Sequence, residues 1–191
     1  ILRAIWLGDA LVLVQEYIAA PTLAAVLTEQ PSALGDRSAV LSFLRVLCQT
    51  ILTLHERQIA HGDLKPDNIL VVNATNQEPS DEGDAAQATG PQPVLIDLLD
   101  FSPADDGERR STAYAPPSGG RFERDCFAVT KIAEEMLTAI ALEQDDVPRL
   151  GEAVGRIRSS SPENATLLPL LEAIDVCLAD APREQRRRLT L

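Results

Sequence analysis

The sequence predicts an α+β domain that is mostly helical and carries a few short β-strands. Three stretches, 38–55, 124–140 and 167–178, space their apolar residues three and four apart, as an amphipathic helix requires. Two short runs, 11–14 and 69–72, are instead continuously apolar and rich in Val, Ile and Leu, which is typical of buried strands. The length of 191 residues is enough for one such domain with a buried core.

Composition and charge narrow the classes of protein that fit. Apolar residues make up 45% and charged residues 24% of the chain, as in ordinary globular domains. The formal net charge of −12 argues against direct binding to nucleic acid or to an anionic membrane surface. Cys48, Cys126 and Cys177 are odd in number and far apart, which favours neither a disulfide framework nor a zinc site. The sequence shows no signal peptide and no apolar run of membrane-spanning length, so we expect a cytoplasmic domain with reduced thiols.

The first part of the chain predicts a strand followed by two helices. The strand is 11–14, and a turn with small residues and Pro21 follows it. Apolar residues on one side of 22–30 indicate a short helix. Ser38 has the side chain of a helix cap, so we expect the long helix to begin there and to run to His55.

The rest of the chain predicts a hairpin and further helices. The strands 69–72 and 93–97 flank residues 73–92, which are polar, acidic and rich in Ala, Gly, Pro and Gln. Such a segment buries too little apolar surface to offset its ordering entropy, so we expect a disordered acidic insertion that widens the hairpin. A further helix opens near Asp125, and at least one more carries the apolar face of 167–178.

The residues that carry chemistry are concentrated in 61–68, directly before the second strand. This stretch reads His-Gly-Asp-Leu-Lys-Pro-Asp-Asn and places Asp63, Lys65 and Asn68 at short, fixed offsets. Phosphoryl transfer needs a carboxylate that orients the attacking hydroxyl and accepts its proton, a cation near the moving phosphate and an oxygen that holds a metal. The stretch supplies one residue of each kind.

The stretch closely resembles the catalytic loop of protein kinases, His-Arg-Asp-x-Lys-x-x-Asn, with Gly62 in place of the arginine. The resemblance implies that Asp63 is the catalytic base, that Lys65 contacts the phosphate of ATP and that Asn68 is a ligand of Mg²⁺. His61 would support the loop by hydrogen bonding. In many kinases the missing arginine pairs with a phosphorylated activation loop, so we expect no activation through that ion pair here.

A second metal ligand is expected where the strand 93–97 ends, because kinases have Asp-Phe-Gly at this place. Two registers compete. Asp97 ends the apolar run, whereas Asp100, followed by Phe101, matches the Asp-Phe pair but leaves Asp97 inside the strand. A buried, unpaired carboxylate in a strand would be costly, so we favour Asp97 as the Mg²⁺ ligand, with Asp100 as the alternative. Neither register has the glycine.

The resemblance also covers the nucleotide-binding hinge. Residues 1–18 would form the end of the N-terminal lobe and the hinge, with Gln15 at the gatekeeper position. The backbone carbonyl of Glu16 and the backbone amide of Ile18 would face the adenine edge of ATP. Leu70, in the strand after the catalytic loop, would supply the apolar floor under the adenine.

Residues 19–191 resemble the C-terminal lobe of a kinase. Residues 102–110 would be the activation segment, and 112–117 resembles the Ala-Pro-Glu region that shapes the platform for a protein substrate, with Pro117 in place of the acid. Asp125 matches the aspartate that opens the central helix of that lobe and would cap backbone amides of the catalytic loop. His55 would be a packing residue.

The resemblance therefore implies a mostly helical, protein-kinase-like C-lobe from a diverged Ser/Thr protein kinase of bacterial type. The Gly-rich loop, the strand lysine and the helix glutamate that cover the phosphates are missing, so the N-lobe is largely absent. We expect the chain to be a fragment of a longer protein with further domains and to be inactive by itself. The expected cofactors are ATP and Mg²⁺, and the expected partner is a protein substrate.

Two other functions stay open. Aminoglycoside and choline phosphotransferases also use His-Gly-Asp with an Asn five positions beyond, so Gly62 fits a small-molecule kinase, whereas Lys65 and residues 114–116 count against one. The degraded Asp-Phe-Gly and Ala-Pro-Glu motifs fit a pseudokinase kept for binding or regulation. The intact acid and metal-holding residues count against that reading.

Overall fold

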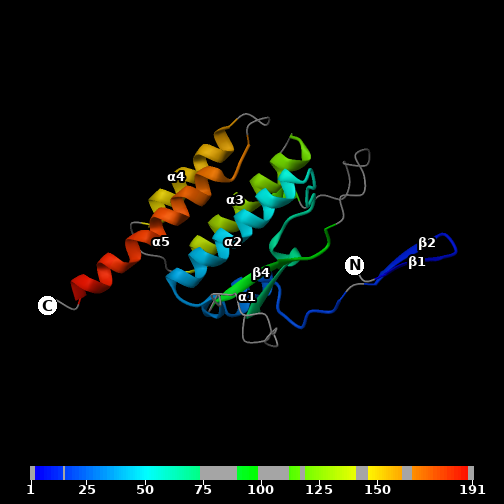
Figure 1. The fold of residues 1–191 in the computed structure, drawn as a ribbon, viewed down its shortest axis with the longest axis horizontal. Helices are drawn as coiled ribbons and strands as arrows, with labels where there is room; N and C mark the ends of the chain where they lie inside the picture. Colours follow the sequence, from blue (N-terminus) through cyan, green and yellow to red (C-terminus); the bar gives the residue numbers. More distant parts are fainter. Residues whose placement is uncertain are drawn as a thin grey trace.

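The computed structural model describes most of the chain and shows a helical body with a separate β-hairpin (Figure 1). The described residues are 3–14, 16–73, 90–98, 112–116, 119–140, 146–160 and 165–188. The α+β, mostly helical fold class predicted from the sequence is confirmed.

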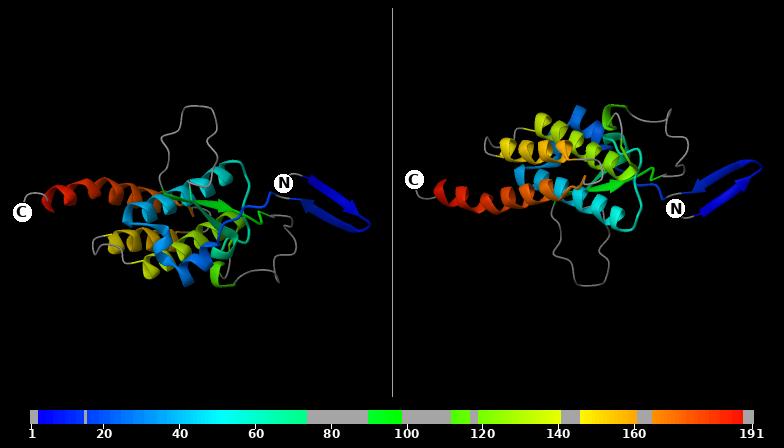
Figure 2. Two further views of the ribbon diagram at one scale, coloured as in Figure 1. Left: turned by 90° about the horizontal axis from the view of Figure 1, so that it is seen from below. Right: turned by 90° about the horizontal axis from the view of Figure 1, so that it is seen from above.

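The body is built from helices that pack around one core. Figures 1 and 2 show α2, α3, α4 and α5 lying side by side, with α1 at one end of the bundle. Apolar side chains from all of these helices and from the first strand of the body form one buried cluster. The helices are α1 (Leu23–Glu29), α2 (Arg37–Glu56), α3 (Arg121–Ala139), α4 (Asp146–Ser159) and α5 (Leu168–Arg188), and short 3₁₀ turns lie at Pro31–Leu34, Pro66–Asn68 and Thr112–Tyr114.

The start of the long helix α2 differs from the prediction. Ser38 was expected to be the cap, but the Asp36 side chain accepts a hydrogen bond from the Ala39 backbone N–H at 2.9 Å, and Ser38 is already helical. Gly35 precedes the cap with φ +87°, a turn conformation that favours glycine and brings Asp36 into capping position. The observed cap therefore lies two residues before the predicted one, and the helix begins at Arg37.

A buried ion pair ties the first turn of α2 to α4 and α5. The Arg37 guanidinium donates to both carboxylate oxygens of Asp146, and its Nη2 also donates to the Cys177 carbonyl at 2.9 Å. The Asp146 side chain is only 4% exposed. These bonds join α2 to two helices whose contact residues lie more than a hundred positions later in the sequence.

The body carries a two-stranded antiparallel sheet of β3 (Ile69–Asn73) and β4 (Pro91–Leu95), with Ile69 opposite Leu95. The strands include Asn73, Pro91 and Gln92, which the prediction had assigned to the ends of the insertion. Gly90 is also described, and residues 74–89 of that predicted insertion lie outside the described residues. A bridge between Thr22 and Leu70 attaches the sheet to the segment before α1.

The second sheet is the hairpin of β1 (Arg3–Leu7) and β2 (Ala10–Val14), which projects from the body (Figures 1 and 2). β2 was predicted, and β1 was not. The strands join through a two-residue turn in which Gly8 has φ +62°. Trp6 on β1 is 69% exposed.

By length and composition α2 would also qualify as a membrane-spanning helix. Seven of its side chains are buried in the core cluster, which is the behaviour of a central core helix. The sequence analysis found no apolar run of membrane-spanning length, whereas α2 reaches that length and apolar composition. The chain's three cysteines are buried and not joined in disulfides.

Candidate active site

The candidate catalytic loop, residues 61–68, lies between α2 and β3 and is hydrogen-bonded to Asp125 of α3. The buried carboxylate of Asp125 accepts backbone N–H bonds from His61 at 2.8 Å and from Gly62 at 3.0 Å. His55 Nε2 on α2 donates to the same carboxylate at 3.0 Å. Three donors compensate the desolvation of this buried acid. The predicted capping role of Asp125 and the predicted structural role of His55 are both confirmed.

The loop brings three of the predicted site residues together. Lys65 Nζ lies 2.7 Å from Asp63 Oδ2, and Asn68 Nδ2 donates to the Asp63 backbone carbonyl at 2.8 Å. The 3₁₀ turn Pro66–Asn68 folds the chain back so that these offsets meet, and the Asn68 N–H donates to the Lys65 carbonyl at 2.9 Å. The side chains of Asp63 and Lys65 are 38% and 26% exposed, so the acid and the cation remain accessible to a substrate.

Asp97 is joined to the same loop through the residue before it. The Ile96 N–H donates to the Asn68 carbonyl at 3.0 Å, and the Ile96 carbonyl accepts from His61 Nε2 at 3.0 Å. Asp97 itself is exposed and has φ +56°, a conformation that few non-glycine residues adopt and that is often found at functional sites.

The structure changes the reason for preferring Asp97 over Asp100. The prediction assumed that Asp97 would otherwise be a buried carboxylate within the strand, but β4 ends at Leu95 and Asp97 is exposed beyond it. The burial cost therefore does not distinguish the two registers. Asp100 lies outside the described residues, and the contacts of Ile96 with the loop are what now favour Asp97.

His61 is held in one neutral form. Its Nε2 faces the Ile96 carbonyl and must carry the proton, because a carbonyl only accepts. Its Nδ1 is buried and has no hydrogen-bond partner among the residues that the structure describes. A second proton there would be an unsatisfied buried donor. Burial accordingly lowers the pKa of His61 below its ordinary value, and the nearby Asp125 carboxylate and Ile96 carbonyl only partly oppose that effect.

Gly62 occupies the position where the kinase pattern has arginine. Its φ is +84°, in the left-handed region that glycine adopts without steric cost. This backbone conformation lets the Gly62 N–H point at Asp125. Glycine therefore suits the geometry of the loop, and the loop has no cationic side chain at this position.

Tyr114 lies in the segment before α3, where it bonds to α3 and lines a cavity beside the loop. Its hydroxyl donates to the Glu135 carboxylate on α3, with oxygen distances of 2.8 and 3.0 Å, and Tyr114 lines a small cavity together with Gly62 and Asp63. Burial, followed by the Glu135 carboxylate, raises the pKa of Tyr114, so the hydroxyl keeps its proton. The sequence analysis did not identify Glu135, since no local pattern marks it as the partner of a tyrosine 21 residues earlier.

The predicted hinge residues lie at the junction between the hairpin and the body. Glu16 is exposed, and Ile18 is half-buried with its carbonyl accepting from the Ala20 N–H at 2.9 Å. Leu70 is 8% exposed in β3. Their roles toward adenine stay predictions, and Gln15, the predicted gatekeeper, lies outside the described residues.

The proposed metal ligands suit Mg²⁺ by their chemistry. Asn68 Nδ2 is anchored on the Asp63 carbonyl, which leaves the amide oxygen for a cation, and Asp97 supplies an exposed carboxylate. Mg²⁺ is commonly held by one or two such oxygens with water and substrate phosphates. Within the described ranges no three His, Cys, Asp or Glu side chains gather into a protein-only metal site. A cation here would depend on the phosphates for the rest of its ligands.

Comparison with known proteins decides the family. The family model described as the protein kinase domain matches residues 2–113, more than half of the chain. The chain belongs to the protein kinase family. The match includes the hairpin, the loop 61–68 and both strands of the body, so Asp63, Lys65, Asn68 and Asp97 lie inside the matched region.

Similar proteins include myosin light chain kinase 3 of Danio rerio, 35% identical over 68 residues, and that of Homo sapiens, 39% identical over 66 residues. Serine/threonine-protein kinase PAK 1 of Mus musculus is 35% identical over 85 residues. These alignments cover 36%, 35% and 44% of this chain. They span only 9%, 8% and 15% of the relatives, so this kinase chain corresponds to a small part of each of them.

Proposed function

We propose that the chain is the C-lobe of a Ser/Thr protein kinase and that, within a longer protein, its residues take part in the transfer of the γ-phosphoryl group of ATP to a hydroxyl of a protein. The observation that carries this proposal is the joint placement of Asp63, Lys65 and Asn68 in one loop that is also bonded to the residue before Asp97. The name of the similar serine/threonine-protein kinase PAK 1 supports Ser/Thr specificity, as does Lys65 in the loop.

In the proposed reaction the half-exposed Asp63 carboxylate accepts the proton of the substrate hydroxyl. The hydroxyl oxygen then forms a bond to the γ-phosphorus while the bond from that phosphorus to the bridging oxygen of ADP breaks. Lys65, 2.7 Å from Asp63, places a positive charge beside the transferring group. Mg²⁺, held by Asn68 and Asp97 together with the phosphates, would neutralise charge on the phosphate oxygens.

The adenine would bind between the hinge and β3. The proposal assigns the Glu16 carbonyl and the Ile18 amide to the adenine edge and Leu70 to the apolar floor. The bridge between Thr22 and Leu70, which holds β3 beside the segment that follows the hinge, supports this arrangement. The Gly-rich loop and strand lysine of a complete kinase would come from other parts of a longer protein.

The test is ATP turnover by the protein that contains this chain, measured with and without Mg²⁺. Asp63→Asn should lower kcat by at least about a hundredfold, which is the lower range for loss of a general base. Asp67→Asn, an exposed carboxylate in the same loop, is the matched control and should stay near the wild-type rate. Full activity in Asp63→Asn and in Asp97→Asn would refute the site assignment.

A regulatory pseudokinase is the second candidate, and the residues after Asp97 favour it. Leu98 stands where a kinase has phenylalanine, and the glycine is absent. A pseudokinase would show no Mg²⁺-dependent turnover even in the complete protein. A small-molecule kinase, the third possibility, would place radiolabelled phosphate on an added alcohol and not on protein.

A further inference from the structure

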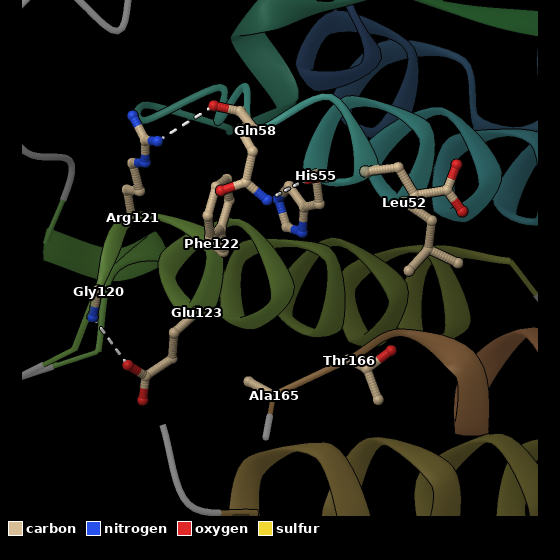
Figure 3. Close-up of a pocket in the computed structure, with 10 residues that line it drawn as sticks. Leu52, His55, Gln58, Gly120, Arg121, Phe122, Glu123, Ala165 and Thr166 are labelled. Atoms are coloured by element: carbon tan, nitrogen blue, oxygen red, sulfur yellow. Dashed lines mark hydrogen bonds between the residues drawn. The ribbon is translucent and has the colours of Figure 1, made fainter. Parts of the chain in front are cut away.

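A surface groove of about 460 Å³ lies on the body, and no residue of the loop 61–68 lines it. It is bounded by the last turn of α2, the first turn of α3 and residues 165–166 before α5 (Figure 3). We call it the α2–α3 groove. The phosphoryl-transfer site does not use it, because its lining contains none of the residues assigned to ATP, metal or base.

The groove combines an apolar floor with a polar rim. Half-buried Leu52, Phe122 and Ala165 supply apolar surface, and the acidic residues that line the groove are exposed Glu56 and half-buried Glu123. This combination is typical of sites that accept an amphipathic side chain, whose stem covers apolar surface while its charged head stays at the rim.

The polar groups around the groove are mostly engaged with one another. Arg121 Nη2 donates to the Gln58 carbonyl at 3.1 Å, and its guanidinium lies 4.8 Å from the centre of the Phe122 ring (Figure 3). The Glu123 carboxylate accepts a hydrogen bond from the Gly120 N–H at 3.0 Å and so caps this backbone donor at the start of α3. His55 is bonded to Asp125.

Glu56 is different. It is exposed, it is the last residue of α2, and it forms no ion pair with any residue that the structure describes. A carboxylate at a helix C-terminus faces the negative end of the helix dipole, where a cation would be favourable. The α2 side of the groove therefore carries a carboxylate that has no ion-pair partner among the described residues.

We propose that the α2–α3 groove binds a peptide segment of a partner protein in which a Lys or Arg stands next to an apolar side chain. The apolar side chain packs on Leu52 and Phe122, and the cation pairs with Glu56. The charge complementarity at Glu56 selects a basic segment over an acidic one. This inference goes beyond the proposed function. Because peptide binding needs no ATP turnover, each of the two proposals can be tested without the other.

The experiment measures fluorescence anisotropy of labelled octapeptides with a central Leu-Arg-Leu, Leu-Lys-Leu or Phe-Arg-Leu and no Ser, Thr or Tyr. Glu56→Lys should weaken binding to the purified protein by about fivefold or more, and raising the salt should weaken it further. Glu172→Lys, which reverses an exposed charge on α5, is the matched control and should change the Kd less than twofold. Circular dichroism confirms that each variant is folded.

Three outcomes would overturn the proposal. These are the absence of saturable binding for all of the peptides, an equal loss in Glu56→Lys and Glu172→Lys, and a loss in Asp67→Lys without one in Glu56→Lys. The second outcome would indicate attraction to the overall charge of −12, and the third would indicate binding at the catalytic loop.

Discussion

At the scale of single residues, His61 couples the site to pH. The unfolded chain binds a proton at His61 near the ordinary pKa of 6.5, whereas the folded chain resists protonation because its pKa is lowered. Below 6.5 the unfolded state therefore binds more protons, and the folded state loses stability as the pH falls. Above 6.5 the contribution of this group is fully present.

We expect urea unfolding midpoints to rise with pH between about 5 and 6.5 and to show a smaller rise in His61→Gln. Glutamine can still donate to the Ile96 carbonyl but does not titrate. An identical pH dependence in the variant and the wild-type chain would show that another group is responsible.

Gly62 gives a second prediction at the same scale. Gly62→Ala places a side chain on backbone with φ +84° and should lower the free energy of unfolding by about 1–2 kcal/mol. Gly155→Ala is the matched control, since Gly155 lies inside α4 with open space around its Cα, and it should raise the free energy by about 0.5–1 kcal/mol. Chemical denaturation of both variants measures the change in the free energy of unfolding and its sign. An unchanged free energy of unfolding in Gly62→Ala would contradict the argument.

At the scale of elements, the contact between Arg37 and Asp146 holds α2 against α4 and α5. Burial by itself would raise the pKa of Asp146, but the Arg37 guanidinium outweighs it and holds the pKa below 3.8. The contribution of this carboxylate is therefore present above its unfolded pKa and is lost as the pH falls through the lower folded value. The stability contributed by Asp146 is therefore lost at a lower pH than the stability contributed by His61.

Arg37→Ala should cost about 3–5 kcal/mol, because it leaves a buried carboxylate without its cation. The comparison is Arg156→Ala, which removes an exposed pair with Glu152 and should cost less than about 0.5 kcal/mol. Urea unfolding at neutral pH measures both values. Similar losses in the two variants would mean that the Asp146 pair contributes no more than a surface pair.

The elements also show where sequence reasoning succeeds and where it fails. The helices α2, α3 and α5 follow from apolar spacing, because each buries one continuous face. The sequence analysis did not place α4, and its composition explains the omission. Pro148, Gly151 and Gly155 all lower helix propensity, and burial of its apolar face, including Leu150 and Ile157, compensates in the folded chain.

The same distinction applies to the site. Asp63, Lys65 and Asn68 lie within six residues of the chain, so their short spacing alone places them close together. The pairing of Asp125 with the loop was predictable only through the kinase resemblance. Contacts such as Tyr114 with Glu135 depend on how helices pack, which no local pattern specifies.

At the scale of the whole molecule, the hairpin and the helical body are separate in the views of Figures 1 and 2. The single tryptophan, Trp6, lies on the hairpin and is 69% exposed. We therefore expect iodide to quench its fluorescence in the native 191-residue chain nearly as well as in the urea-unfolded chain. Strong protection from the quencher would show that β1 is covered.

The buried carboxylate of Asp125 receives the backbone amides of His61 and Gly62 as well as the His55 ring. An amide hydrogen exchanges with solvent only when its bond opens, and these two bonds end on a helix in the centre of the body. The two loop amides should therefore exchange as slowly as the core of α3, although they lie in a stretch without regular secondary structure. Deuterium uptake would then show that the loop 61–68 opens only when the helical body itself unfolds.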